Sequence, residues 1–211
     1  GNGQEKGVRA PHGSSKQQLY QLTPKEHPLQ IDRRQLANFV LKSRAIIGEG
    51  GDLGRCLEWD EPFLTIDGFG DMCTFADSFV YSEPNPSEPL MGKPGRKQLL
   101  DGSRAYWGDL NDVSGIGIEP ETFGLIVVAF VFEHVARPFT AMSNLAYILR
   151  PGGYILWAAP MFQHYHGAPS DFFRYTPKGA RTLAEDAGLE VVDLYAPGSL
   201  GLTSGVMMGM T

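Results

Sequence analysis

The chain has 211 residues, a length that suits one domain with a sizeable core. Its 42% apolar and 20% charged residues are ordinary for a soluble globular protein. The net charge of −6 argues against a nucleic-acid partner, which would need a basic face, and no apolar run is long enough for a transmembrane helix.

The chain opens on a polar segment, residues 1–31, that is rich in Gly, Pro, Gln and Lys. We expect it to form a poorly ordered arm or a strap over the domain. Residues 33–47 place apolar side chains at helical spacing after Asp32, a suitable N-cap, and are predicted to form a helix. The glycine-rich stretch 48–54 follows this helix and precedes a strand. A dinucleotide-binding loop has the opposite order, so the stretch is predicted to be a connector.

Short apolar or alternating segments recur along the rest of the chain and are predicted to be strands. They are residues 55–59, 72–76, 105–107, 123–130, 154–159 and 190–195. Two more helices are predicted, at 138–149 and 177–187. Residues 82–98 hold four prolines and two glycines and are predicted to be a long surface insertion. The last segment, residues 198–211, is predicted to be an apolar tail.

Cys56 and Cys73 fall in the first two predicted strands and have no partners at metal-ligand spacing. So few cysteines in so long a chain argue against a disulfide framework. We therefore expect a soluble protein of a reducing compartment, either the cytoplasm or the interior of an organelle.

Strands that alternate with helices predict an α/β domain over residues 32–197. The expected fold is Rossmann-like and doubly wound, with a mostly parallel sheet of six to seven strands and helices on both faces. Ligands of such sheets bind beyond the carboxyl ends of the strands. The candidate site residues are therefore those in the loops that follow the predicted strands.

Two acidic residues follow predicted strands on the first side of this site. Asp77 comes about 20 residues after Glu58, the spacing at which nucleotide-binding α/β folds hold ribose hydroxyls, although a plain turn residue fits too. Asp109 follows the third strand in the pair Gly108-Asp109. It could accept a hydrogen bond from an adenine amino group, with Gly108 leaving room for the base, or it could simply cap a turn.

Phe130 and His134 follow the long apolar strand on the second side. Phe130 ends that strand and is predicted to contact the cofactor. His134 could act as a base near neutral pH, or it could be a structural hydrogen-bonding residue at a helix start, which is the commoner role.

The segment 160–176 follows the next strand and is crowded with His, Tyr, Asp, Arg and Phe. Loops with such residues are often functional, so we predict that this one binds the acceptor, with His164 or His166 as a base. A metal site would need a third ligand, for example Asp171 or Glu133. No spacing motif supports such a site, and none is predicted.

Three further residues of this loop are predicted to contact the acceptor. Tyr165 lies between the two histidines, and Asp171 and Arg174 follow a few residues later. Asp171 and Arg174 could orient the acceptor, or they could pair with each other and fix the loop.

Three stretches carry a resemblance to a known family. Residues 123–138 read FGLIVVAFVFEHVARP, residues 146–160 read AYILRPGGYILWAAP, and residues 165–177 read YHGAPSDFFRYTP. Together they resemble the class I S-adenosylmethionine-dependent methyltransferases, in particular a small-molecule and sugar-type branch. The resemblance covers residues 100–197 well and residues 33–99 loosely.

The resemblance implies S-adenosylmethionine as cofactor and methyl transfer to an oxygen or nitrogen of an unidentified acceptor. Glu58, Asp77 and Asp109 would hold the cofactor. The chain departs from the family pattern after the first strand, where residues 57–64 read LEWDEPFL and lack the glycines of the usual turn. It has Gly124 where the family usually has Asp, and it ends soon after the sixth predicted strand, where the family usually supplies a seventh.

These departures keep a second hypothesis open. The chain could be a catalytically inactive relative that serves as a structural subunit and meets protein partners through residues 1–31 and 198–211. A third hypothesis, a nicotinamide-dependent oxidoreductase, is weak because no Gly-x-Gly-x-x-Gly follows the first strand.

Overall fold

The computed structural model describes residues 33–48, 51–59, 66–81, 94–167, 170–195 and 203–209. The predicted arm, residues 1–31, lies outside this range. Among the helices in these ranges, none has the length and apolar character needed to cross a membrane.

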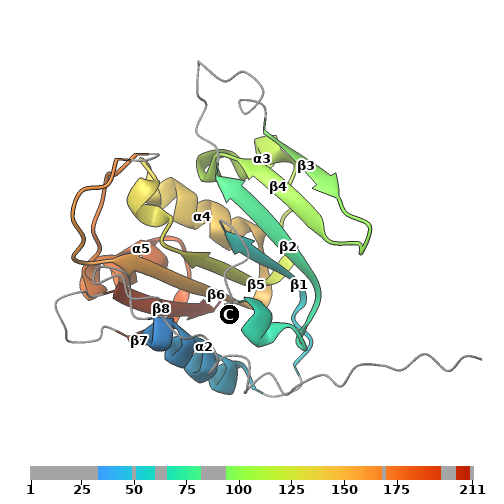
Figure 1. Cartoon of the computed structure of the whole chain (residues 1–211), viewed down its shortest axis with the longest axis horizontal. Coiled ribbons are helices and arrows are strands. Elements are labelled where there is room, and N and C mark those ends of the chain that lie inside the picture. Colours follow the sequence, from blue (N-terminus) through green and yellow to red (C-terminus); the bar gives the residue numbers. More distant parts are fainter. Residues whose placement is uncertain are drawn as a thin grey trace, which may run out of the picture.

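The elements alternate between strands and helices along the chain (Figure 1). The strands are β1 (Gly54–Trp59), β2 (Cys73–Tyr81), β3 (Gly95–Gln98), β4 (Arg104–Gly108), β5 (Phe123–Ala129), β6 (Leu149–Pro160), β7 (Glu190–Tyr195) and β8 (Thr203–Gly209). The α-helices are α2 (Arg33–Ile47), α3 (Val113–Ile116), α4 (Pro138–Ile148) and α5 (Pro177–Asp186). Short 3₁₀ helices are η1 (Ile66–Phe69), η2 (Leu110–Asp112) and η3 (Phe132–His134). The predicted helices and all six predicted strands are present, with shifted ends.

The described strands form one sheet in the order β3-β4-β2-β1-β5-β6-β8-β7. The five central strands β4, β2, β1, β5 and β6 are parallel, whereas β3, β8 and β7 run antiparallel to a neighbour. Strand order reverses between β1 and β5, which is the switch point where such sheets bind ligands. The predicted Rossmann-like, doubly wound, mostly parallel sheet is thus confirmed.

The side chains of β5 show how one strand serves two cores. Leu125 and Val127 pack in a cluster with Phe39 and Val40 of α2. Ile126 and Val128 point the other way, into a larger cluster that includes residues of α4 and α5. Successive side chains of a strand face opposite sides of the sheet, so a continuous apolar run requires helices on both faces. Figure 1 shows α2 on one side of the sheet and α4 on the other.

Two segments at the ends of the sheet differ from the sequence predictions. The predicted insertion at 82–98 contains β3, whose Gly95 to Gln98 pair antiparallel with β4. The predicted apolar tail contains β8, which pairs with β6 on one side and β7 on the other. The expectation that the chain lacks a seventh strand of the family is therefore wrong. The run TSGVMMG has no clear alternation of apolar and polar residues, and its pairing with β6, more than 40 residues earlier, cannot be read from the sequence.

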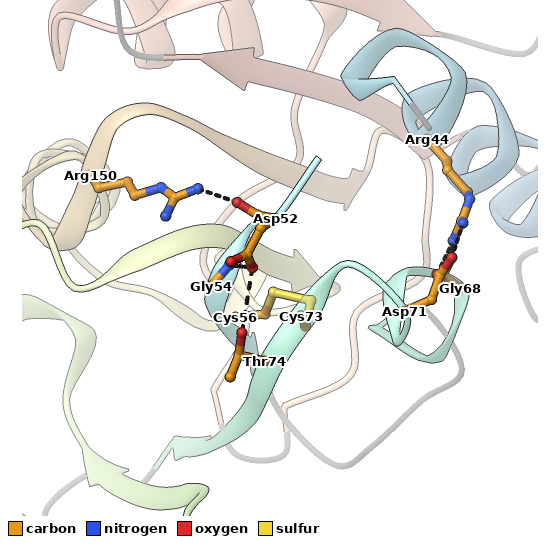
Figure 2. The surroundings of a disulfide bond; sticks show 9 residues. All are labelled: Arg44, Asp52, Gly54, Cys56, Gly68, Asp71, Cys73, Thr74 and Arg150. Carbon is orange, nitrogen blue, oxygen red and sulfur yellow. Dashed lines mark hydrogen bonds and ion pairs between the residues drawn. A yellow bond between two sulfur atoms is a disulfide. The ribbon is translucent and has the colours of Figure 1, made fainter. Parts of the chain in front are cut away.

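A disulfide bond joins Cys56 of β1 to Cys73 at the start of β2 (Figure 2). The sequence argued against a disulfide, because the 17-residue separation does not reveal that the two strands are neighbours. Once β1 and β2 pair in parallel, the two Cα atoms lie 5.8 Å apart, within disulfide range. The prediction of a reducing compartment assumed that the chain has no disulfide. The Cys56–Cys73 bond removes that support for it.

Arg150 ties the connector before β1 to the start of β6. Its guanidinium donates to the backbone oxygen of Asp52 at 2.8 Å, as Figure 2 shows. A Cβ on Gly124 would lie 2.0 Å from the backbone oxygen of Leu53 and 2.9 Å from the Arg150 guanidinium carbon. The connector therefore passes so close to β5 that only glycine fits, which accounts for the absence of the family's Asp at this position.

Candidate functional site

The predicted site residues separate into two groups along the carboxyl ends of the parallel strands. One group follows or lies within β1, β2 and β4, where the resemblance places the cofactor. The other follows β5 and β6 and contains the histidines. The two groups have different surroundings.

Asp77 does not lie where the sequence placed it. β2 continues to Tyr81, so Asp77 is in the middle of the strand, paired in register with Leu57 of β1. Its buried carboxylate accepts from the Arg55 guanidinium at 2.6 Å and from the Arg104 backbone N–H at 2.8 Å. Burial raises the pKa of this carboxyl group, although both donors act against the rise. The carboxylate therefore belongs to an ion pair within the sheet, because the strand continues five residues beyond its predicted end at Ala76.

Glu58 and Trp59 end β1 at the expected edge. Glu58 is buried one residue before the end of the strand. The Trp59 indole is also buried and stacks on Phe79 of β2, with ring centroids 3.6 Å apart. The stack occupies the end of the strand pair, while the rest of the stretch 57–64, from residue 60 on, lies outside the described part of the chain.

Asp109 follows β4 and caps η2. Its carboxylate accepts from the backbone N–H of Asn111 at 2.8 Å and from the Asn111 side-chain amide at 2.9 Å. Asp109 as a whole is half-buried. Gly108 has a φ of +150°, and a Cβ there would lie 2.7 Å from Ile116. The close packing of α3 against Gly108 therefore requires a glycine at this position, whether or not a ligand binds there.

Phe130 turns the chain at the end of β5. Its φ of +60° is rare for a residue with a side chain, and its N–H donates to the Ala158 carbonyl of β6 at 2.8 Å. The half-buried ring stands directly after the parallel strand. Backbone strain at such a position is common beside functional sites.

Glu133 is the most perturbed group on the second side. Its residue is 1% exposed, and among the described residues its Oε2 atom has no hydrogen-bond partner. Burial raises the pKa of its carboxyl group to about 7, and the Arg174 charge only partly offsets the rise. The sequence named Glu133 only as a possible metal ligand. A glutamate beside a histidine after an apolar strand was the available signal, but burial cannot be read from that pattern.

His134 and His166 come together although 31 residues separate them in sequence. Their rings meet edge to face with centroids 4.9 Å apart. The Nδ1 atom of His134 bonds to the Ser170 carbonyl, and the backbone N–H groups of Phe172 and Phe173 donate to the Glu133 carbonyl. The loop after β6 therefore folds back over η3 and is held there through backbone groups.

Asp171 and Arg174 pair with each other, as the sequence allowed. Both guanidinium nitrogens of Arg174 reach the Asp171 carboxylate, and Arg174 also donates to the backbone oxygen of His164 at 3.0 Å. Asp171 in turn accepts from the His166 backbone N–H at 2.9 Å, and its Oδ2 lies 3.5 Å from His166 Nδ1. Arg174 lowers the pKa of Asp171 well below its ordinary range. The pair fixes the loop and places His166.

A layer of buried rings supports this cluster. Tyr175 donates its hydroxyl to the Phe132 carbonyl at 2.9 Å. Phe132 and Trp157 pack edge to face, and both are fully buried. Burial raises the pKa of the Tyr175 hydroxyl, so it stays a donor at neutral pH. Glu133 and His134 are thus next to tightly packed, buried side chains.

The outer surface of the same loop is apolar. Its exposed rings are Phe162, Tyr165, Phe172 and Phe173. The side chain of His164 is also exposed, and its ring meets only His166 of the cluster, edge to face with centroids 6.2 Å apart. Among the predicted acceptor residues, the structure therefore places His134, His166, Asp171 and Arg174 together, and it leaves His164 and Tyr165 at the surface.

The fold and one segment of sequence match known proteins. Residues 99–157, from the end of β3 into β6, match a family model described as a methyltransferase domain. No curated protein shows a significant sequence match to the chain.

Solved structures extend the match to most of the chain. A candidate methyltransferase in complex with the Haloferax volcanii Trm112 methyltransferase activator is 15% identical over 82% of this chain and 88% of that chain, with a TM-score of 0.58. The trans-methyltransferase CalH in complex with SAH is 11% identical over 87% of this chain and 61% of that chain, with a TM-score of 0.59. The cyclase SpnF is 10% identical over 88% and 85%, with a TM-score of 0.58.

At these identities the structures show the fold alone, and it is a fold found in methyltransferases, one of them solved with SAH. The resemblance seen in the sequence is therefore confirmed. The narrower sugar-type branch stays a prediction. A cyclase shares the same fold, so the activity has to be argued from the residues of the site.

Proposed function

We propose that the chain is an S-adenosylmethionine-dependent methyltransferase that acts on an oxygen or nitrogen nucleophile of an acceptor bound over the carboxyl ends of β5 and β6. The observation that carries the proposal is the group Glu133, His134 and His166. These titratable side chains converge beside the switch point of a sheet with methyltransferase topology.

Transfer of a methyl group to a hydroxyl or amine releases a proton from the acceptor, so a positioned base accelerates the step. His134 and His166 are our candidates. Each has its Nδ1 directed at an oxygen of the protein, which leaves Nε2 to take the proton. His164 is less suitable, because its exposed ring meets only the His166 ring and lies outside the group formed with Glu133.

The residues around the cluster suit an acceptor site. Asp171 and Arg174 act as positioning residues, because they hold the loop and orient His166. Tyr165 and the other exposed rings offer an apolar surface on which an acceptor can stack. Much of the rate gain would come from holding the two reactants in line in such a site.

The donor chemistry of the first side fits the cofactor. S-Adenosylmethionine supplies an electrophilic methyl group and presents hydroxyl, ammonium and amino donors. The Glu58 and Asp109 carboxylates can accept from them at the ends of β1 and β4, and Phe130 can offer an apolar contact. We leave Asp77 out of this set, because its carboxylate is engaged by Arg55 inside the sheet.

The competing hypothesis of an inactive subunit loses part of its support. It relied on an apolar tail that is free to dock, but residues 203–209 form β8 and pair on both sides. A protein partner for the arm at residues 1–31 stays a prediction.

Calorimetric titration with S-adenosylhomocysteine tests the cofactor site. We expect micromolar binding that Asp109→Ala weakens about tenfold, or about 1.4 kcal/mol. Asp112→Ala is the matched control, because Asp112 also caps a short helix but follows Asp109 by three residues. No binding by the wild type at millimolar ligand would contradict the proposed function. Equal losses in the two variants would contradict the role of Asp109.

A further inference from the structure

Glu133, His134 and His166 each offer one ligand atom, and these atoms all lie within 4.8 Å of one another. Two imidazole nitrogens and one carboxylate oxygen are the donor set of an open zinc site, in which a fourth position is left for water or substrate. No metal-binding motif is present in the sequence, because His166 comes close to Glu133 and His134 only when the loop after β6 folds over η3.

The hydrogen bonds of both imidazoles match those of metal-bound histidines. A histidine that binds a metal through one nitrogen usually donates the other N–H to a carbonyl or a carboxylate. His134 directs Nδ1 at the Ser170 carbonyl. His166 directs Nδ1 at the Asp171 carboxylate, 3.5 Å away, and at the His164 carbonyl, 3.3 Å away. Both rings are thereby oriented with Nε2 available for a metal ion.

Glu133 supplies a second, independent observation. Only 1% of the residue is exposed to solvent. Its Oε2 atom has no hydrogen-bond partner among the described residues. An unsatisfied buried carboxylate oxygen is costly. A cation between Glu133 and the two imidazoles would satisfy it.

Distances and exposure also fit an accessible ion. Zinc bonds of about 2.0–2.2 Å in a tetrahedron place ligand atoms about 3.4 Å apart. The present spacing therefore has to contract by roughly 1.4 Å at most, which small side-chain rotations can supply. The His166 side chain is 28% exposed, so solvent and an ion can reach the cluster.

The geometry points to a divalent transition-metal site of the zinc type, formed by Glu133, His134 and His166 with Asp171 and the Ser170 carbonyl behind the two imidazoles. Imidazole and carboxylate ligands together favour zinc and its neighbours in the first transition row over magnesium or calcium. Metal binding does not depend on the proposed function. A role in methyl transfer does rest on it. The ion would bind the acceptor oxygen or nitrogen and lower its pKa, so that its proton could pass to water. The imidazoles would then be ligands instead of bases.

Titration of the metal-free full chain with Zn²⁺ against a chromophoric chelator tests the site, and Co²⁺ absorption reports the coordination. We expect one tightly bound ion per chain. Glu133→Gln and His166→Gln should each weaken binding about 100-fold or more, whereas His164→Gln should leave it unchanged. His164 is the matched control, because its exposed side chain is two residues from His166. His12 and His27 remain in every variant, so any metal bound by them appears as a constant background.

Circular dichroism and thermal unfolding in chelator establish that each variant is folded. Asp171→Asn keeps all three ligands and should weaken binding about 10–100-fold. Zn²⁺ should raise the melting temperature of the wild type and of His164→Gln, but not of folded His166→Gln. The inference is overturned if the wild type binds Zn²⁺ no better than His166→Gln, or if His164→Gln is as damaging as His166→Gln. S-Adenosylhomocysteine binding, measured with and without Zn²⁺, reports separately on the proposed function.

Discussion

Two parts of the same sheet are stabilised in different ways. β5 is buried from Phe123 to Val128 and carries no charged side chain. β2 begins with alternating exposed residues, and its contacts include the disulfide at Cys73 and the ion pair of Asp77 with Arg55. Nearby, Arg44 of α2 pairs with Asp71 just before the strand (Figure 2). Where apolar burial is complete, packing suffices, and where it is partial, side-chain cross-links add stability.

The largest effect is expected from truncating the layer under β5. Phe132→Ala should lower the free energy of unfolding by about 3–5 kcal/mol, because Phe132 is fully buried against Trp157 and leaves a cavity. Denaturant unfolding measures the change. Phe139→Ala is the control, since Phe139 is 52% exposed, and should change stability by less than about 0.5 kcal/mol. Similar values for the two variants would mean that this region is not packed as described.

Removing the disulfide comes second. The two cysteines are 17 residues apart in the sequence. For a loop of this length, the chain-entropy argument predicts that removing the bond lowers the free energy of unfolding by about 3 kcal/mol. We expect this loss on comparing the wild type with the double variant Cys56→Ala and Cys73→Ala in the absence of reductant. Adding dithiothreitol should destabilise the wild type toward the variant and leave the variant unaffected. If the wild type were equally stable with and without reductant, the cross-link would not support β2.

The smallest effect is expected from the Arg44–Asp71 pair. The Asp71 side chain is 60% exposed, so Asp71→Asn should cost less than about 1 kcal/mol, and less still at high salt. Hydrogen bonding by Arg44 lowers the pKa of Asp71 below its ordinary value of 3.8. The contribution is therefore complete above that value and is lost as the pH falls through the lower pKa of the folded state.

Unfolding measured at neutral and acidic pH, at low and high salt, checks this prediction. Glu185→Gln on α5 removes another exposed pair, Arg181–Glu185, as a control. A cost for Asp71→Asn well above 1 kcal/mol would show that η1 depends on this ion pair more than its exposure implies.

The sequence determined most of the fold on the β5–β6 side. The apolar run at 123–130 and the caps of α5 indicated buried parallel strands and covering helices, and the family motifs lie in the same region. The bounds of β2 were predicted less accurately from the sequence, because a strand in which polar residues alternate with apolar ones has a weak apolar pattern. The end of β2 was placed at Ala76, and Asp77 was consequently assigned to the site although it lies inside the sheet.

The sequence by itself determined the strand and helix alternation, the class of fold and the crowding of chemistry at residues 160–176, because these depend on local apolar periodicity and short motifs. Only the tertiary structure decided which distant residues meet: Cys56 with Cys73, β8 between β6 and β7, and His166 with Glu133 and His134. Such contacts depend on strand order and on how a loop folds back over its neighbour. Neither the spacing nor the composition of the chain records that information, and the burial that raises the pKa of Glu133 arises only when the contacts form.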